Sequence, residues 1–299
     1  MKKWMLLSRA PFLFLAVVLG FLGASVAWYE SGPSGGMFNL GYAFLAGFGI
    51  VLAHIAVNAY NEYFDFKSGV DFRTPKTPFS GGSGALPGGL ATARQAFWLA
   101  TVALLIDVPI GVYFVIVKGW ALMPLIIVAG VCIIIYTPFI LKMGWPEWAP
   151  GLGLGLLPIL GAYFVHTGQY AWTAFVAAVP PFILVHNLLL LNEFPDVQAD
   201  RTVKRRTLPI VAGTRNAAVV YSMMTGFVYV WIVGAVAIGL MPAFALLALL
   251  TIPLAVKAIR GSFHFGDMAK LVPAMANNVF VVLLTQLLMG VGYILARVV

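Results

Sequence analysis

The chain has 299 residues, of which 62% are hydrophobic and 9% are charged. Soluble domains carry about 25% charged residues, so the composition excludes a soluble globular protein and indicates a polytopic membrane protein. The net charge of +8 would favour nucleic acid binding in a soluble protein, but here the side of the membrane on which the charges lie explains it better. The single cysteine, Cys132, lies in an apolar run, which excludes an intrachain disulfide.

Nine apolar stretches approach the length of about 20 residues that a bilayer crossing requires. We expect membrane spans at residues 11–29, 38–60, 95–117, 119–139, 148–167, 171–191, 216–239, 241–258 and 277–297. The first 28 residues also resemble a signal peptide, but their apolar run is long for one, so we interpret it as the first span. The pattern predicts an all-α integral membrane protein with about nine helices and a single domain over residues 1–299.

Lysine and arginine are divided very unevenly between the two sides of these spans. With the N-terminus inside, 16 of the 18 basic residues face the cytoplasm, and only Lys118 and Arg297 lie outside. Because basic loops remain on the cytoplasmic side, we predict a cytoplasmic N-terminus and an external C-terminus. Such a basic inner face suits the plasma (inner) membrane of a bacterial or archaeal cell, with an organelle inner membrane as the alternative.

One acidic pattern occurs twice, and six of the ten acidic residues belong to it. The first copy is Asn61-Glu62-Tyr63-Phe64-Asp65 followed by Asp71, and the second is Asn192-Glu193-Phe194-Pro195-Asp196 followed by Asp200. Both copies follow spans whose ends face the cytoplasm, four spans apart. This spacing indicates two four-helix repeats plus one helix, around a central cavity open to the cytoplasmic side. A single copy is typical of a capped helix end, whereas two on one side favour a shared site.

Carboxylates gathered at one membrane surface repel one another unless a cation joins them. Residues four apart share a helix face, so Asn61 aligns with Asp65. Gly69 is expected to end that helix so that Asp71 folds back, and Pro195 interrupts the second copy. Magnesium commonly bridges a few carboxylates to substrate phosphates. We therefore predict two or three Mg²⁺ ions and a diphosphate, with the metal ligands Asn61, Asp65, Asp71, Asn192, Asp196 and Asp200.

Basic side chains near both motifs would complete the diphosphate site, although several of them also serve as topology signals. The candidates are Lys67, Arg73, Lys142, Lys204 and Arg205. His54 and His186 lie within spans, and we expect them to bond between helices rather than to bind metal. The glycine- and serine-rich run at 80–89 lacks the Gly-Lys-Ser/Thr ending of a nucleotide-binding loop, so the sequence does not indicate ATP binding. The loop over residues 61–94 is long enough to form a lid over the site.

These motifs resemble those of the UbiA superfamily of intramembrane prenyltransferases over nearly the whole chain. Within the superfamily, the six-residue interval from Asp65 to Asp71 and the run at 80–87 are similar to the menaquinone branch. Tyr136-Thr137-Pro138 with Lys142 and Arg9-Ala10-Pro11 also match family elements. The sequence departs from the family at two places: Glu62 stands where Asp is commoner, and Lys204-Arg205-Arg206-Thr207 stands where the family often has Gly-Lys-Thr. It also lacks the Arg-Thr-x-x-Arg-Pro run that follows the first motif in the ubiquinone and haem branches.

The resemblance implies Mg²⁺-dependent transfer of a polyprenyl group from its diphosphate to an aromatic acceptor. For the menaquinone branch that acceptor is 1,4-dihydroxy-2-naphthoate. Asp65, Asp71, Asp196 and Asp200 would be catalytic, Tyr136 would steady the allylic cation or position the acceptor, and Arg9 would bind the acceptor's carboxylate. Homogentisate, 4-hydroxybenzoate, a chlorophyllide and a glycerol phosphate are the alternative acceptors. An ion-coupled transporter is the alternative of another class, but its acids usually lie near the midplane.

Overall fold

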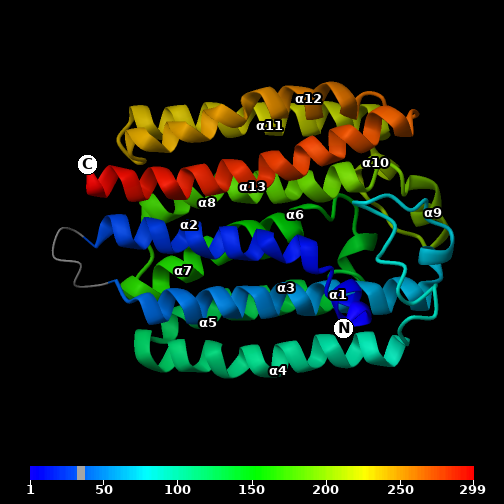
Figure 1. Cartoon of the computed structure of the whole chain (residues 1–299), viewed down its shortest axis with the longest axis horizontal. Coiled ribbons are helices and arrows are strands. Elements are labelled where there is room, and N and C mark those ends of the chain that lie inside the picture. The colour runs from blue at the N-terminus through cyan, green and yellow to red at the C-terminus, as the bar shows by residue number, and fades with distance from the viewer. Residues whose placement is uncertain (32–37) are drawn as a thin grey trace.

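In a computed structural model the chain forms a bundle of long, roughly parallel and antiparallel helices, shown in Figure 1; residues 1–31 and 38–299 are described. These residues contain no β-strand. The helices are α1 (Lys2–Leu7), η1 (Ala10–Leu13), α2 (Phe14–Glu30), α3 (Leu40–Ser68), η2 (Val70–Phe72), α4 (Ala93–Lys118), η3 (Trp120–Leu122), α5 (Met123–Ile135), η4 (Ile140–Lys142), α6 (Trp148–Pro150), η5 (Gly151–Leu156), α7 (Leu157–Thr167), α8 (Trp172–Asn192), α9 (Val197–Thr202), α10 (Leu208–Val211), α11 (Thr214–Ala237), η6 (Ala243–Thr251), α12 (Ile252–Ser262) and α13 (Met268–Val298).

Eight helical segments among the described residues are long and apolar enough to cross a membrane. The fourth predicted span corresponds to the shorter apolar helix Trp120–Ile135, which η3 and α5 form together. The eighth is built by η6 and α12 over Ala243–Ser262. Several helices outrun the predicted spans: α3 continues to Ser68 and α13 begins at Met268. Hydropathy marks only the apolar part of a helix, whereas the backbone hydrogen bonds continue beyond it.

The short elements α1, α9 and α10 gather at one end of the bundle, which we call the motif end (Figure 1). The C-terminus of α13 lies at the opposite end. The segment between α5 and α6 is joined there to the segment after α9, because the Arg206 N–H donates to the Leu141 carbonyl (2.8 Å) and the Leu208 N–H donates to the Glu147 carboxylate (2.7 Å). These bonds connect the two halves of the chain across the motif end.

Three glycines place η5, a π-helical stretch, in close contact with α8 and α5. A Cβ atom on Gly151 would lie 2.7 Å from the Phe182 carbonyl oxygen, and one on Gly155 would lie 2.7 Å from the Phe182 Cα. On the other side, a Cβ on Gly153 would lie 3.3 Å from the Cβ of Cys132. Glycine is required where backbones approach this closely, as in many membrane helix contacts.

Candidate active site

A cavity of about 220 Å³ opens between the helices near the motif end, and both acidic motifs line it. Its polar lining includes both motifs and two arginines: Arg9, Asn61, Asp65, Asp71, Asn192, Glu193, Asp196, Asp200 and Arg205. Much of the remaining wall is apolar, with Val185 and Leu188 from α8, Val279 and Val282 from α13, and Ile133 from α5. Two stretches far apart in sequence therefore converge on one cavity.

The first motif occupies a single face of α3. His54, Asn58, Asn61 and Asp65 follow one another at intervals of four, three and four residues, and all line the cavity. Gly69, with φ +76°, ends the helix in the left-handed conformation. The short helix η2 then returns the chain, and Asp71 is 95% buried in the cavity wall.

The second motif lies on an interrupted helix. α8 ends at Asn192, the chain turns through Pro195, and α9 begins after Asp196. Pro195 has no amide hydrogen and cannot continue the hydrogen bonds of α8. Asp196 and Asp200 reach the cavity from this turn and from α9, as the sequence predicted for a break near Asn192.

Arg205 connects the two motifs. Its guanidinium donates to the Asp200 carboxylate at 2.8 Å and forms a second ion pair with Asp65, 140 residues away in sequence. Burial lowers the pKa of the Arg205 guanidinium, but the two carboxylates outweigh burial and raise it above its usual value. Arg205 thus stays charged and supplies a cation where the carboxylates of both motifs meet.

Glu62 is fully buried and is used differently from the other motif acids. Its carboxylate accepts from the Arg9 Nε at 2.9 Å, and from the amide and hydroxyl of Ser83 at 2.8 and 2.7 Å. Asn61 is held by Arg9, which donates to its Oδ1 at 2.9 Å, and its Nδ2 donates to the Thr137 hydroxyl at 3.2 Å. Glu62 therefore ties the N-terminal segment and the glycine-rich loop to α3.

The glycine-rich loop forms part of the cavity wall. Phe79, Ser80, Gly81 and Gly82 line the cavity, and a Cβ on Gly82 would lie 2.7 Å from the Asp71 Oδ1. Gly82 also has a φ of +70°, which favours glycine. The loop thus packs directly against one of the predicted metal ligands.

Several buried oxygens that line the cavity lack a hydrogen-bond donor. They are the Asp71 Oδ2, Asn192 Oδ1, Glu193 Oε2 and Asp196 Oδ1. Buried polar atoms are normally paired, so this set fits a cation that takes oxygen ligands and shares them with waters and phosphates, as Mg²⁺ does. In the described part of the chain, no three His, Cys, Asp or Glu side chains are gathered tightly enough to form a complete metal site by themselves.

Two carboxyl groups of the motifs that lie outside the spans have raised pKa values. Burial, together with repulsion from Asp65 and Glu62, raises the pKa of Asp71 to about 7. Burial, with repulsion from Asp200, raises the pKa of Asp196 to about 8. Carboxylates that gain protons in a crowded, dry site become ionised when a cation joins them.

The remaining predicted residues divide into two groups. Tyr136 lines the cavity and is 91% buried. Lys67, Arg73, Lys142 and Lys204 are exposed and lie outside the cavity lining. The sequence carries no local signal for the contacts of Glu62 or of the fully buried Glu147, because their partners lie 53 and 61 residues away along the chain.

The sequence profile of the UbiA prenyltransferase family matches residues 16–284. The chain belongs to the UbiA prenyltransferase family. It is 29% identical over 224 residues to the 1,4-dihydroxy-2-naphthoate octaprenyltransferase of Bacillus subtilis, covering 72% of this chain and 68% of that relative. It is 28% identical over 237 residues to the digeranylgeranylglyceryl phosphate synthase of Pyrococcus abyssi, covering 74% and 73%.

The fold also matches that of a solved UbiA homologue from Archaeoglobus fulgidus bound to GPP and Mg²⁺. The TM-score is 0.63 at 11% sequence identity, over 99% of this chain and all of the other. At this identity the match shows the shared fold. Together, the profile and the fold make this UbiA protein a multi-pass membrane prenyltransferase.

Proposed function

We propose that this UbiA protein transfers a polyprenyl group from its diphosphate to an aromatic ring, with 1,4-dihydroxy-2-naphthoate as the acceptor, in menaquinone biosynthesis. The observation that carries the proposal is the convergence of both acidic motifs on one cavity whose deeper walls are apolar. The polar end suits a diphosphate and the apolar end suits an isoprenoid chain. The Bacillus subtilis relative, named for this reaction, supports the choice of acceptor.

In the proposed reaction, the bond between the allylic carbon and the diphosphate oxygen breaks and the ring forms a bond to that carbon. Asn61, Asp65 and Asp71 from the first motif, with Asn192, Asp196 and Asp200 from the second, would hold Mg²⁺. When bound, Mg²⁺ would neutralise charge on the departing diphosphate. Arg205 adds a fixed positive charge at the same place. The acceptor's carboxylate leaves as carbon dioxide when the ring is alkylated, which returns the electron pair to the ring.

The cavity would also protect the reactive carbon. The aliphatic walls from α8 and α13 exclude water from an allylic cation. Tyr136, buried in the lining, offers a ring that can stabilise a cation or contact the acceptor. Arg9, held by Glu62 and Asn61, is the proposed partner of the acceptor's carboxylate.

The test is prenyl transfer by the purified protein in lipid nanodiscs. One labelled polyprenyl diphosphate would be offered with 1,4-dihydroxy-2-naphthoate, homogentisate, 4-hydroxybenzoate or a chlorophyllide, and products identified by mass spectrometry. We expect Mg²⁺-dependent formation of a prenylated, decarboxylated naphthalene together with diphosphate. Absence of that product, with efficient prenylation of another acceptor, would reject the naphthoate assignment.

A glycerol phosphate acceptor is the second candidate, because the Pyrococcus abyssi relative is a digeranylgeranylglyceryl phosphate synthase of nearly equal identity. That reaction alkylates an alcohol rather than a ring and releases no carbon dioxide. Including geranylgeranylglyceryl phosphate in the same assay separates the two, since only the naphthoate reaction yields labelled CO₂ from a carboxyl-labelled acceptor.

A further inference from the structure

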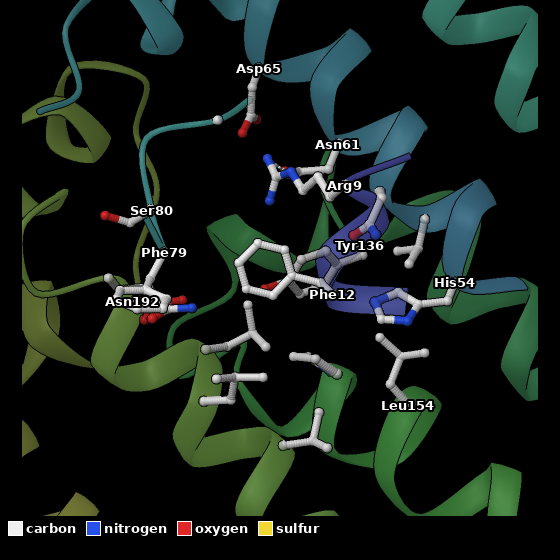
Figure 2. A pocket seen from close by; sticks show the side chains of 18 of the residues that line it. Arg9, Phe12, His54, Asn61, Asp65, Phe79, Ser80, Tyr136, Leu154 and Asn192 are labelled. Atoms are coloured by element: carbon white, nitrogen blue, oxygen red, sulfur yellow. Dashed lines mark hydrogen bonds between the residues drawn. The ribbon is translucent and has the colours of Figure 1, made fainter. Parts of the chain in front are cut away.

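One polar side chain in the cavity has no part in the reaction proposed above. His54 lies on the α3 face that carries Asn61 and Asp65, seven residues before Asn61, and therefore about 10 Å farther from the motif end. It is 96% buried, and its Nδ1 has no hydrogen-bond partner among the described residues. Figure 2 shows its imidazole in the pocket on the same side of the view as Arg9, Asn61 and Tyr136.

The surroundings of His54 explain why this is unusual. Its surroundings in the cavity lining include the apolar residues Phe12 and Leu154. Asn58, one turn along the same face of α3, is already engaged, because its Nδ2 donates to the Ser8 carbonyl at 3.0 Å. A polar group at membrane depth ordinarily pairs with another group. His186, the comparable buried histidine on α8, does so: it accepts from the Trp145 Nε1 at 2.8 Å, and its Nδ1 lies 3.0 Å from the Asn187 Oδ1. His54 is therefore a binding group that the protein itself leaves unpaired.

The two sides of the cavity differ in what they can bind. The side formed by Val185, Leu188, Val279 and Val282 offers only hydrocarbon and matches an isoprenoid chain. An isoprenoid cannot satisfy an imidazole, because it has no polar atom. A hydroxylated ring can, since a hydroxyl both donates and accepts a hydrogen bond. The side that carries His54 therefore suits the acceptor.

We propose that His54 hydrogen-bonds a ring hydroxyl of the acceptor and so determines which aromatic acceptors bind. This inference rests on the proposed function. In 1,4-dihydroxy-2-naphthoate the 1-hydroxyl is adjacent to the carboxylate and bonds to it internally, which leaves the 4-hydroxyl for the protein. With the carboxylate at Arg9 near the motif end, the 4-hydroxyl points deeper into the membrane, toward His54.

The test is equilibrium binding without Mg²⁺ or prenyl diphosphate, so that no turnover is needed. Dissociation constants would be measured anaerobically for 1,4-dihydroxy-2-naphthoate and for 1-hydroxy-2-naphthoate, which lacks only the 4-hydroxyl. The wild-type protein is expected to bind the dihydroxy compound about tenfold more tightly. His54→Leu should reduce that preference to less than about twofold, and His54→Asn, which keeps a polar atom near the Nδ1 position, should retain most of it.

His186→Leu is the matched control, because it removes a buried histidine that lies outside the cavity lining. It should lower thermal stability and leave the preference unchanged. An unchanged preference in His54→Leu, an equal loss of it in His186→Leu, or no binding of the naphthoate by the wild-type protein would overturn the inference. Binding that depends on His54 without prenyl transfer in the assay above would reject the proposed function alone.

Discussion

The two acidic motifs share a pattern but are held in different ways. In the first, α3 is continuous through Asp65, and Glu62 is fixed by Arg9 and Ser83. In the second, the helix is interrupted after Asn192, and Glu193 keeps a buried oxygen without a donor. Identical residue types therefore perform different tasks: the first copy also anchors the segments that close the cavity, whereas the second offers most of the unpaired oxygens.

The largest effect is expected from removing one carboxylate of each motif. Asp65→Ala and Asp196→Ala should each lower prenyl transfer by at least about 100-fold, because each removes a carboxylate that we propose holds the cation at the leaving group. Asp65→Ala should also lower thermal stability, since it leaves Arg205 with one carboxylate partner. Asp196→Ala should not, because it removes a half-buried acid whose buried Oδ1 has no donor.

Asp267→Ala serves as the control, because Asp267 lies outside the cavity, where its side chain caps α13 by accepting from the Ala269 N–H and forms an ion pair with Lys270. It should leave turnover unchanged. Wild-type rates in Asp65→Ala or Asp196→Ala, measured on folded protein, would contradict the assignment of the site.

A smaller effect is expected from one methyl group beside the first motif. Gly82→Ala places a Cβ 2.7 Å from the Asp71 carboxylate and should lower turnover roughly tenfold to a hundredfold by displacing it. Gly69→Ala has a similar positive φ of +76° but no atom within 4 Å, so it should cost about 1 kcal/mol of stability and little activity. Equal activity losses in the two variants, measured at saturating substrate, would show that backbone strain alone is responsible.

The pH dependence of Mg²⁺ binding tests the raised pKa values of about 7 for Asp71 and about 8 for Asp196. Where Mg²⁺ binding displaces one proton from a carboxyl group, the apparent Mg²⁺ affinity should fall about tenfold for each pH unit below the pKa of that group. We expect half-maximal Mg²⁺ concentrations to fall from pH 6 to 8 and to level off above. Asp71→Asn should make this dependence less steep, and an unchanged slope would exclude Asp71 as a ligand.

The same groups predict the sign of a stability change. Their folded-state pKa values lie above the unfolded value of about 4, so the folded protein binds more protons between about pH 4 and 8. Without metal, their contribution to stability is therefore lost as the pH rises through this window. Mg²⁺ should raise the unfolding temperature more at pH 8 than at pH 6, and the reverse order would contradict the pKa assignment.

The smallest effect distinguishes the two motif glutamates. Glu62→Gln should lower the free energy of unfolding by about 1–3 kcal/mol, because it removes the charged partner of Arg9. The effect is limited because Arg9 is partly exposed and solvent screens its charge. Glu193 forms no ion pair with a basic side chain of the described residues, so Glu193→Gln should change stability less. Proteolysis of residues 73–92 should become faster only in Glu62→Gln, and equal rates in both variants would show that Glu62 does not hold the loop.

The sequence predicts most of this architecture because its signals are local. Apolar length locates the helices, and the repeated acidic pattern predicts that Asp65 and Asp196 share a site. Gly69 and Pro195 mark the helix ends correctly, since each acts on its own backbone. The family and the all-α fold are confirmed by the comparisons.

What the sequence could not supply are pairings across the bundle. The bridge from Arg205 to Asp65 spans 140 residues, and the contact from Glu62 to Arg9 spans 53. Lys67 and Lys142 appear equivalent to Arg205 in sequence, but they are exposed whereas Arg205 lies in the cavity. Only tertiary packing separates them.

The glycines of η5 limit which amino-acid substitutions the protein can accept beside the cavity. With α8 on one side and Cys132 on the other, no residue larger than glycine at 151 or 155 fits without displacing the backbone at Phe182. That backbone precedes Val185 and Leu188, which shape the hydrocarbon side of the cavity. Variation that alters substrate size is therefore expected in the side chains that line the cavity on α5, α8 and α13, while the main chain of α8 keeps its course.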